Sequence, residues 1–410
     1  MNCRHCRAAL HPAQDLFLDI GAAPPSNAFL HAADLGRPER HFPLKVLHCP
    51  ECLLVQVDET QARETLFDPD YVYFSSYSSS WLAHAERHVA QAVERLGLGP
   101  ESLVVEVASN DGYLLQHVLA RGIPCVGIEP TAGTAAVARR RGIETVEAFF
   151  GLEFAASFAA ARGRADLVVG NNVLAHVPDI DDFVGGLREV LAPHGRVSVE
   201  FPHLMRLVQH AQFDTVYHEH FSYLSLHAVR RIFAANGLTV RDVEELPTHG
   251  GSLRVWAGHA DEDADTSTGV ATVLAAERSA GMLEPAFYRG LQPRAERIKD
   301  DLLLFLIEAR RAGRRVAGYG AAAKGNTLLN FAGVRPDLLP FVADASPHKV
   351  GRFLPGSRIP VVDPGRLRDE RPDYVLILPW NLREEIVAQL AWVRDWRGRF
   401  VTAVPALEVS

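Results

Sequence analysis

The sequence predicts an α/β protein in which a small four-cysteine module precedes two doubly wound, Rossmann-like sheets. Three observations support this prediction: two closely spaced cysteine pairs near the start, and two separate stretches in which short apolar strands alternate with amphipathic helices. Apolar strands joined by helices are typical of a parallel sheet that is covered on both faces. The chain has 410 residues, and at roughly 150 residues per domain this length predicts two or three domains.

The composition excludes several classes of protein. Hydrophobic residues make up 48% of the chain and charged residues 22%, which argues against disorder. The formal net charge is −8, so the basic surface of a general nucleic-acid binder is absent and we expect no nucleic-acid partner. The longest strongly apolar run, Leu302–Ile307, is far shorter than a membrane span, and the first residues lack the apolar core of a signal peptide. We therefore expect a soluble, cytoplasmic protein with no membrane partner.

The N-terminal module, placed at residues 1–70, is defined by two C-x-x-C pairs. Each pair offers two thiolates to one ion, so together they predict a tetrahedral zinc site. Its ligands are Cys3, Cys6, Cys49 and Cys52. Four thiolates close the coordination shell, and we therefore expect a structural rather than a catalytic zinc. The alternative is that the four cysteines are unrelated core residues. We expect the fifth cysteine, Cys125, to be such a core residue.

The middle region, placed at residues 71–250, begins with a loop rich in tyrosine and serine. Alternating strands and helices follow it. The expected strands are 103–107, 125–129, 144–148, 166–170 and 196–201, with helices in the gaps. Residues 202–250 are expected to be irregular. The C-terminal region, 251–410, is expected to contain a strand at 253–258, a long charged helix at 284–312 and a second strand–helix alternation.

The turn after the first strand of the middle region predicts a nucleoside-containing cofactor. Asn110, Asp111 and Gly112 form this turn, at the edge of the sheet where such folds bind ligands. Glu129 ends the second strand, where a carboxylate accepts hydrogen bonds from the ribose hydroxyls of NAD or of S-adenosylmethionine (SAM) alike. The glycine-rich cradle for a pyrophosphate is missing, which favours SAM. A nicotinamide cofactor and a turn without a ligand are the alternatives.

Residues 214–223, DTVYHEHFSY, concentrate side chains that transfer protons. In a strand, His218 and His220 would face one way, and Tyr217 and Glu219 the other. Alternate histidines can chelate a metal, but no third ligand is evident and the HExxH spacing is absent. The other interpretations are a structural hydrogen-bonded cluster and proton chemistry. In the latter, His or Glu removes a proton, and Tyr or His holds the oxyanion that results.

Several side chains outside this run are expected near the same crevice. His176 follows the fourth strand and is either functional or an ordinary turn histidine. Tyr71, Tyr73 and Tyr77 come from the connecting loop. Of these, Tyr71 is the candidate catalytic residue, with Tyr73 as its competitor.

Two turns rich in small residues are candidates for substrate contacts. His249 precedes two glycines in THGGSLR, which either let the backbone approach a ligand or begin a hairpin. Lys324 in GYGAAAKGN lies near a predicted helix start, where phosphate binds favourably, although the run is not a Walker A sequence. Tyr319 and Asp344, from two expected strands of the same unit, are further candidates.

In this order, the motifs resemble the nucleotide-sugar C-methyltransferases of deoxysugar biosynthesis, which methylate C-3 of the sugar. The resemblance covers nearly the whole chain. It rests on CxxC…CxxC, SNDGYLL, GIEP, NNVLAHV, VYHEHFSY, HGGSLR, GYGAAAKGNTLLN and LPWN. It implies a zinc-binding N-terminal domain, a SAM-binding middle domain and a Rossmann-like C-terminal domain that helps to hold the sugar nucleotide. It also implies SAM contacts and catalytic residues. These are Asn110–Gly112, Glu129, Asn171 and Asn172 for SAM, and Tyr71, His176, Tyr217, Glu219 and His220 for catalysis.

The resemblance implies a SAM-dependent C-methyltransferase that acts on a nucleotide-linked 4-keto-deoxysugar. The ketone acidifies the C-3 proton. His220 is the first choice for the base, with Glu219 as its rival or its orienting partner. Tyr217 and His176 would stabilise the enolate oxygen. The alternative functions are methylation at another position or of a non-sugar ketone, epimerisation, and non-catalytic binding of zinc and SAM.

Overall fold

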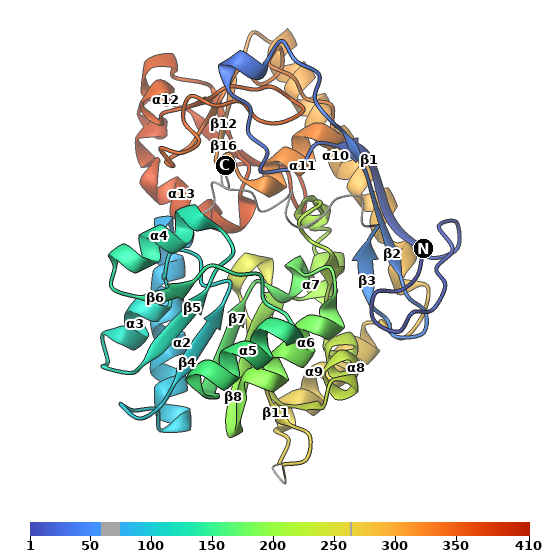
Figure 1. Ribbon diagram of the computed structural model, residues 1–410. Helices are drawn as coiled ribbons and strands as arrows, with labels where there is room; N and C mark the ends of the chain where they lie inside the picture. Colours follow the sequence, from blue (N-terminus) through green and yellow to red (C-terminus); the bar gives the residue numbers. More distant parts are fainter. Residues whose placement is uncertain (59–73, 263–264) are drawn as a thin grey trace.

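The computed structural model describes residues 1–58, 74–262 and 265–410. Tyr71 and Tyr73 therefore lie outside the described residues. Figure 1 shows the central sheet below, the C-terminal domain above it and the N-terminal strands at one side. In the described part of the chain, no helix is long and apolar enough to cross a membrane.

The N-terminal module is an antiparallel sheet of three consecutive strands that a distant segment completes. These strands are β1 (Leu16–Ala23), β2 (Phe42–His48) and β3 (Val55–Val57). The fourth is β9 (Ser222–Tyr223), which pairs with β3. The residues directly after the YHEH run therefore belong to the N-terminal sheet.

The central sheet has seven strands in the order β10-β11-β8-β7-β4-β5-β6. Their bounds are β4 (Val104–Val107), β5 (Cys125–Ile128), β6 (Glu144–Val146), β7 (Ala165–Asn171), β8 (Leu191–Pro202), β10 (Leu238–Leu246) and β11 (Ser252–His259). β4 to β8 are parallel, whereas β11 lies antiparallel between β8 and β10. The strand order reverses between β4 and β7, which opens a crevice at their carboxyl ends.

Helices cover both faces of this sheet (Figure 1). They are α2 (Ser79–Leu96), α3 (Leu115–Leu119), α4 (Ala132–Arg140), α5 (Leu152–Arg162), α6 (Ile180–Val190), α7 (Leu204–Gln209) and α8 (Leu226–Ala235). Successive strand residues point to opposite faces. Val105 and Val168 accordingly pack into the core that α5 and α6 cover, and Val104 and Leu167 into the core under α2.

The expectation of an irregular segment at 202–250 is wrong. This segment contains α7, α8 and the nine-residue strand β10. Ser225 begins α8 by accepting a hydrogen bond from the backbone N–H of Ala228 at 3.1 Å. β10 is an edge strand with several charged residues, so its apolar pattern is weak. The boundary expected after residue 250 divides β10 from β11, although the two strands pair with each other.

The C-terminal domain carries a second, six-stranded sheet in the order β14-β13-β12-β15-β16-β17. Its strands are β12 (Val316–Tyr319), β13 (Val342–Ala343), β14 (Val361–Val362), β15 (Tyr374–Ile377), β16 (Arg399–Thr402) and β17 (Glu408–Val409). The helices that precede or cover it are α9 (Thr268–Ser279), α10 (Leu291–Arg311), α11 (Ala323–Phe331), α12 (Gly365–Glu370) and α13 (Arg383–Gln389). All strands but β17 are parallel to their neighbours. α10 begins later than expected because a 3-10 turn at residues 287–289 precedes it.

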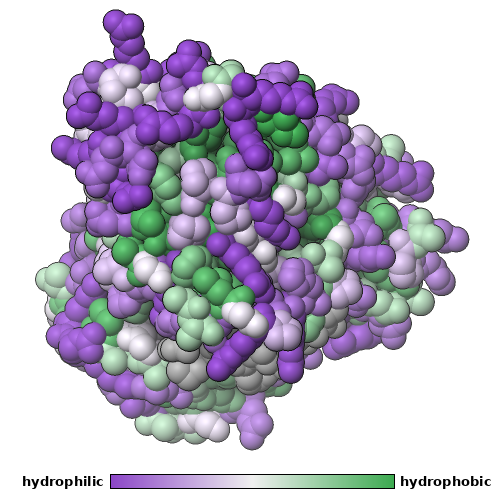
Figure 2. Space-filling model, turned by 90° about the horizontal axis from the view of Figure 1, so that it is seen from above, coloured by the Kyte–Doolittle hydropathy of each residue, from purple (hydrophilic) through white to green (hydrophobic). Residues whose placement is uncertain are grey.

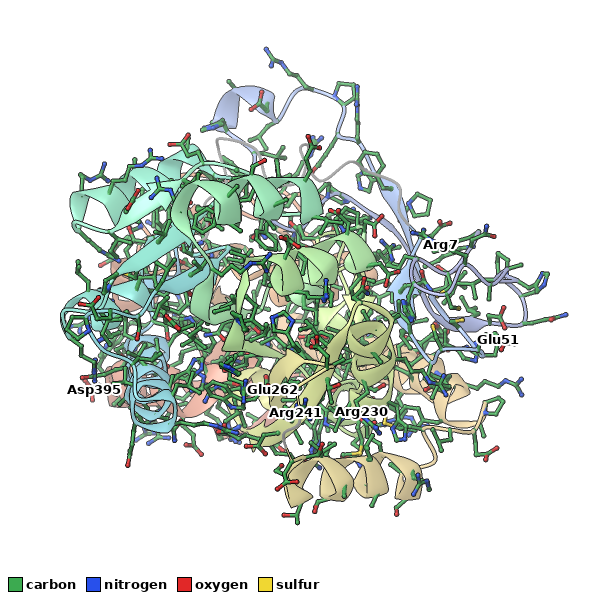
Figure 3. All side chains as sticks on the ribbon, turned by 60° about the horizontal axis from the view of Figure 1, so that its bottom comes forward. Arg7, Glu51, Arg230, Arg241, Glu262 and Asp395 are labelled. Carbon is green, nitrogen blue, oxygen red and sulfur yellow. The ribbon has the colours of Figure 1, made fainter. Side chains whose placement is uncertain are left out.

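Seen from above, the surface is largely hydrophilic, and hydrophobic side chains show between the polar ones (Figure 2). Figure 3 labels Arg241 of β10 and Glu262, which follows β11. The guanidinium of Arg241 donates to the backbone carbonyl of Glu262 at 2.6 Å. This bond ties the chain after β11 to its neighbour at the end of the sheet away from the C-terminal domain.

Candidate active site and zinc site

A cavity of about 1180 Å³ lies at the carboxyl ends of β4, β5 and β7. It exceeds the roughly 300–1,000 Å³ of ordinary small-molecule sites and is large enough for two ligands. All three parts of the chain supply its wall. Among the lining residues are Asn27 from the N-terminal module, Asn110, Glu129 and Asn171 from the central sheet, and Lys324 and Trp380 from the C-terminal domain.

The turn after β4 depends on close backbone packing. Asn110 has a φ of +51° and Gly112 a φ of +79°. A Cβ on Gly112 would lie 2.4 Å from Cδ1 of Ile143, so only glycine allows this approach. The carboxylate of Asp111 is buried 3.5 Å from the guanidinium of Arg141. Gly112 and Asp111 thus stabilise the conformation of the turn. Of the three predicted residues, only Asn110 lines the cavity.

Glu129 follows β5 directly and lies beside this turn. Its carboxylate accepts hydrogen bonds from the backbone N–H of Asn110 at 2.9 Å and from that of Thr131 at 3.0 Å. Burial raises the pKa of the Glu129 carboxyl above its ordinary value, and these hydrogen bonds oppose the rise. The side chain reaches the cavity wall.

The two asparagines after β7 differ in their surroundings. Both side-chain polar atoms of Asn171 are buried in the cavity wall without a hydrogen-bond partner in the described protein. Such an amide costs free energy unless a ligand satisfies it. The Asn172 side chain donates to Nε2 of His249 at 3.1 Å. The polar amide, the nearby carboxylate and the lack of a phosphate cradle fit SAM.

The run Tyr217–His220 forms a turn and not the strand considered above. The backbone N–H of His220 donates to the carbonyl of Tyr217 at 3.0 Å. The histidines therefore diverge: His218 is 3.2 Å from the carbonyl of Phe42 in the N-terminal sheet, whereas His220 lines the cavity. The ring centre of His220 lies 4.0 Å from that of Tyr217 and 4.6 Å from that of His176.

A backbone hydrogen bond fixes the tautomer of His220. Its Nδ1 lies 2.8 Å from the carbonyl oxygen of Thr215. A carbonyl only accepts, so Nδ1 carries the proton and Nε2 keeps its lone pair. Burial, reinforced by His176, holds the imidazole pKa well below its ordinary value, so the ring is neutral near pH 7. The orienting partner of His220 is thus Thr215 and not Glu219, which corrects that expectation.

Glu219 is buried and is not among the side chains that line the cavity. Its Oε1 accepts a hydrogen bond from the side-chain amide of Asn27 at 3.2 Å. Burial raises the pKa of the Glu219 carboxyl to about 7. The His176 ring hydrogen-bonds to the backbone of Glu219, and burial lowers its imidazole pKa to about 4. Asn27 was missed in the sequence because it lies in an arm without a recognisable motif.

The C-terminal wall of the cavity carries a lysine. Nζ of Lys324 donates to the side-chain oxygen of Asn381 at 2.8 Å and lies 4.7 Å from the ring centre of Trp380. Burial lowers the pKa of the Lys324 ammonium to about 8. The indole N–H of Trp380 donates to Asp214 at 2.7 Å, which ties this wall to the segment that precedes the YHEH turn. Trp380 and Asn381 belong to the LPWN motif of the resemblance, to which the sequence assigned no site role.

The remaining predicted substrate residues divide into two groups. His249 lines the cavity in a left-handed conformation with a φ of +55°. Tyr319 and Asp344 do not line it. Tyr319 is buried at the end of β12, and Asp344 accepts a hydrogen bond from the backbone N–H of Ala321 at 2.6 Å. Both therefore support the turn that leads to α11.

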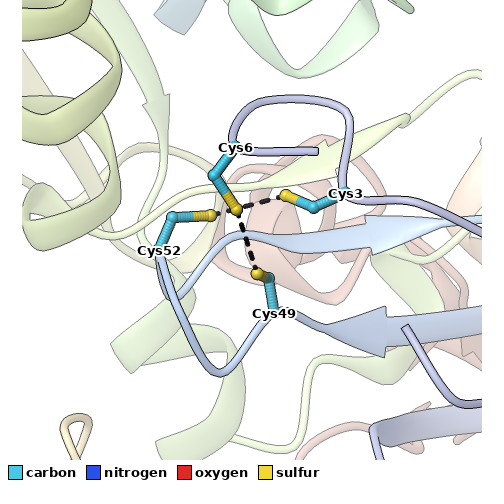
Figure 4. A group of neighbouring side chains, drawn as sticks. All are labelled: Cys3, Cys6, Cys49 and Cys52. Carbon is cyan, nitrogen blue, oxygen red and sulfur yellow. Dashed lines mark hydrogen bonds between the residues drawn. The ribbon is translucent and has the colours of Figure 1, made fainter. Parts of the chain in front are cut away.

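The four cysteine side chains converge as their spacing predicts (Figure 4). Their sulfurs all lie within 4.8 Å of one another. The Cys3–Cys52 and Cys6–Cys49 sulfur pairs are 3.4 and 3.5 Å apart. Zn–S bonds of about 2.3 Å place tetrahedral sulfurs about 3.8 Å apart, so the cluster fits zinc. In the described part of the chain this is the one group of His, Cys, Asp and Glu so arranged, and the YHEH turn forms none.

Both cysteine turns have the same backbone design. The residues after the second cysteine of each pair, Arg7 and Leu53, have φ values of +63° and +67°. Their N–H groups donate to the carbonyls of Cys3 and Cys49 at 3.1 and 2.8 Å. Arg7 and Glu51, which mark the two turns in Figure 3, lie on the same side of the molecule.

Three family models match the chain in succession. They describe a zinc binding domain at residues 3–67, a methyltransferase domain at 81–243 and a C-methyltransferase C-terminal domain at 247–405. The C-methyltransferase NovU of Streptomyces niveus is 38% identical to this chain over 403 residues, which are 98% of this chain and 95% of that relative.

Solved methyltransferase structures align with less than half of the chain. The magnesium protoporphyrin IX methyltransferase of Synechocystis PCC 6803 with bound SAM is 16% identical and covers 43% of this chain and 80% of that chain, with a TM-score of 0.33. A SAM-dependent methyltransferase of Anabaena variabilis is 16% identical and covers 44% and 86%, with a TM-score of 0.36.

Proposed function

The chain belongs to the C-methyltransferase family, and from this premise we propose that it methylates a nucleotide-linked 4-keto-deoxysugar at C-3, the carbon next to the ketone. It is a SAM-dependent C-methyltransferase with a structural zinc site. The observation that carries the proposal is the neutral, fixed imidazole of His220 in the cavity wall. Carbon becomes nucleophilic only after it loses a proton beside a carbonyl, and this step needs such a base.

His220 is the general base of the proposed reaction. The Thr215 carbonyl holds the proton on Nδ1, so Nε2 receives the C-3 proton of the sugar. Protonation creates a buried cation, which the negative charge of the sugar diphosphate and of the developing enolate offsets. SAM supplies the electrophilic methyl group when it is bound.

Tyr217 is the first candidate to stabilise the enolate oxygen. Its ring lies against that of His220, and its side chain lines the cavity. A phenol hydroxyl donates a hydrogen bond to such an oxygen without changing charge. His176 is the weaker candidate, because its neutral ring has one N–H and the hydrogen bond to the backbone of Glu219 uses it. We assign His176 to the orientation of the turn.

Lys324 is the proposed contact for the sugar diphosphate. At neutral pH its ammonium is mainly protonated, and a diphosphate beside it would raise its pKa again. Trp380 and Asn381 hold the side chain against the cavity wall. His249, which is hydrogen-bonded to Asn172, also lines the cavity and is a further proposed substrate contact.

The test is mass spectrometry and NMR on the protein incubated with methyl-labelled SAM and a panel of nucleotide-linked 4-keto-6-deoxysugars. We expect a labelled sugar nucleotide with the new carbon at C-3. In deuterated water without SAM, we expect deuterium to enter at the same carbon. Exchange without methylation would instead indicate epimerisation, and neither signal would indicate a non-catalytic binding module or a non-sugar substrate.

The variant His220→Gln tests the base. We expect it to lose methyl transfer and deuterium exchange by about a hundredfold or more, because a general base contributes roughly that factor. Its affinity for SAM should stay within about twofold, measured by calorimetry. His218→Gln is the matched control, since His218 is buried against the N-terminal sheet. Equal losses of turnover and SAM affinity in His220→Gln would contradict the assignment.

A further inference from the structure

The segment between β1 and β2, residues 24–41, forms an arm of the N-terminal module that reaches the wall of the cavity. After β1 the chain crosses the C-terminal domain before it returns as β2 (Figure 1). Several contacts fix the arm on that domain. Among them are the backbone pair of Leu30 with Phe353 at 2.9 Å, the bond from the Asn326 side chain to the Ser26 carbonyl at 3.2 Å, and the bond from the Gly356 N–H to Glu39 at 2.7 Å.

These contacts hold Asn27, a residue of the arm, against the YHEH turn. Its side chain lines the cavity, and its amide Nδ2 donates to Oε1 of Glu219 at 3.2 Å. The backbone of Asn27 also hydrogen-bonds to the same carboxylate. The other carboxylate oxygen, Oε2 of Glu219, has no hydrogen-bond partner in the described protein. Asn27 is thus the main external support of this buried acid.

Glu219 connects the side chains that surround the proposed base. It precedes His220 directly, and its backbone binds the His176 ring. In the part of the chain that the structure describes, the titratable groups beside it include these two histidines and Tyr223, all buried and all neutral near pH 7. None of these groups is a cation that could compensate the Glu219 carboxylate, so hydrogen-bond donors such as Asn27 hold it in place and oppose its protonation.

We propose that Asn27 is a positioning residue of the reaction site, through which the zinc-binding module holds the Glu219 carboxylate in its place and charge state behind His220. The inference rests on the proposed role of His220 for its catalytic consequence, but not for the contact itself. It makes the N-terminal module part of the reaction site and not only a folding unit. Asn27 acts through Glu219 and is not itself a catalytic residue.

The experiment compares Asn27→Ala and Asn27→Asp with Glu39→Gln in the full-length, zinc-loaded protein. Glu39→Gln is the matched control, because it weakens a contact of the same arm with Gly356 without touching Glu219. The first readout is an infrared titration of the Glu219 carboxyl band, identified by its loss in Glu219→Gln. The second is the pH dependence of kcat with the sugar nucleotide that the substrate panel identifies, together with SAM affinity.

We expect Asn27→Ala to raise the midpoint of the Glu219 band by about one pH unit, and Asn27→Asp to raise it further because a second carboxylate repels the charge. kcat at pH 7 should fall about fivefold, because a rise of about one unit in the pKa leaves roughly one tenth of the Glu219 carboxyl ionised in place of about one half. The acid limb of kcat should move upward, and SAM affinity should stay unchanged. Glu39→Gln should leave both the band and kcat as in the wild type.

An unshifted band or an unchanged kcat in Asn27→Ala would overturn the proposal. An equal loss of kcat in Glu39→Gln would also overturn it, since the arm would then matter only as a docking segment. The infrared readout does not depend on the reaction. If His220→Gln kept full activity, the assignment of His220 as the base would be wrong. The infrared titration would still show whether Asn27 controls the pKa of the Glu219 carboxyl.

Discussion

Replacing Glu200 by Gln tests whether the buried charge network beside the cavity is built as the structure shows. Glu200 is fully buried at the carboxyl end of β8. Its carboxylate lies 2.8 Å from the His84 ring, the Arg254 guanidinium and the Thr248 hydroxyl alike. Thr248 precedes His249, so this carboxylate also anchors the turn that holds His249 against Asn172.

The magnitude follows from the titration of the carboxyl. Burial alone would raise the pKa of Glu200, but His84 and Arg254 lower it from 4.5 to about 2. A difference of this size corresponds to about 3 kcal/mol of folding stability. The folded-state pKa is the lower one, so this stability is fully present above the unfolded-state pKa and is lost as the pH falls toward the folded-state value.

Thermal unfolding followed by circular dichroism measures the effect. At about pH 6 we expect Glu200→Gln to lose about 3 kcal/mol, or about 6–12 °C in melting temperature, because a buried guanidinium loses its main partner. Between about pH 6 and pH 3 the difference from the wild type should shrink by about 2 kcal/mol. Glu244→Gln is the control, because its partly exposed carboxylate is 3.7 Å from Arg254; we expect a loss below about 1 kcal/mol. A Glu200→Gln loss no larger than the control, or one independent of pH, would refute the reasoning.

Two further predictions concern the metal and the cofactor turn. Cys49→Ser should reduce bound zinc from about one ion per chain to nearly none, measured by plasma mass spectrometry, and lower the melting temperature, because a structural zinc contributes folding free energy. Cys125→Ser, outside the cluster, should keep the metal; retention of zinc in both variants would rule out the site. Gly112→Ala should cost about 2–4 kcal/mol and weaken SAM binding about tenfold or more, because its Cβ adds a clash with Ile143 to the strain of a positive φ. Gly97→Ala places alanine in the left-handed region, with a φ of +62°, in open space, so equal losses in the two variants would contradict the clash.

Much of the architecture is visible in the sequence because it depends on local patterns. The C-x-x-C pairs indicate a zinc site, since each pair fixes two sulfurs within one short turn. The strands at β4, β5, β7 and β11 follow from apolar runs bounded by turn residues. The pattern fails at β10, where charged residues on an edge strand reduce the apolar contrast, and at the YHEH run, where alternation suggested a strand and the backbone forms a turn.

The sequence by itself determined the residue types of the candidate site: a four-cysteine cluster, an acid after β5, and histidines with a tyrosine in one run. Only the tertiary structure decided which of them meet. Asn27 and Glu219 are 192 positions apart, and β9 joins the N-terminal sheet across a similar separation. Such contacts depend on how whole elements pack, and packing depends on complementary surfaces that no short window of sequence contains. The spacing of residues therefore predicts the parts of the site, whereas the folded chain alone sets the tautomer of His220 and the surroundings of Glu219.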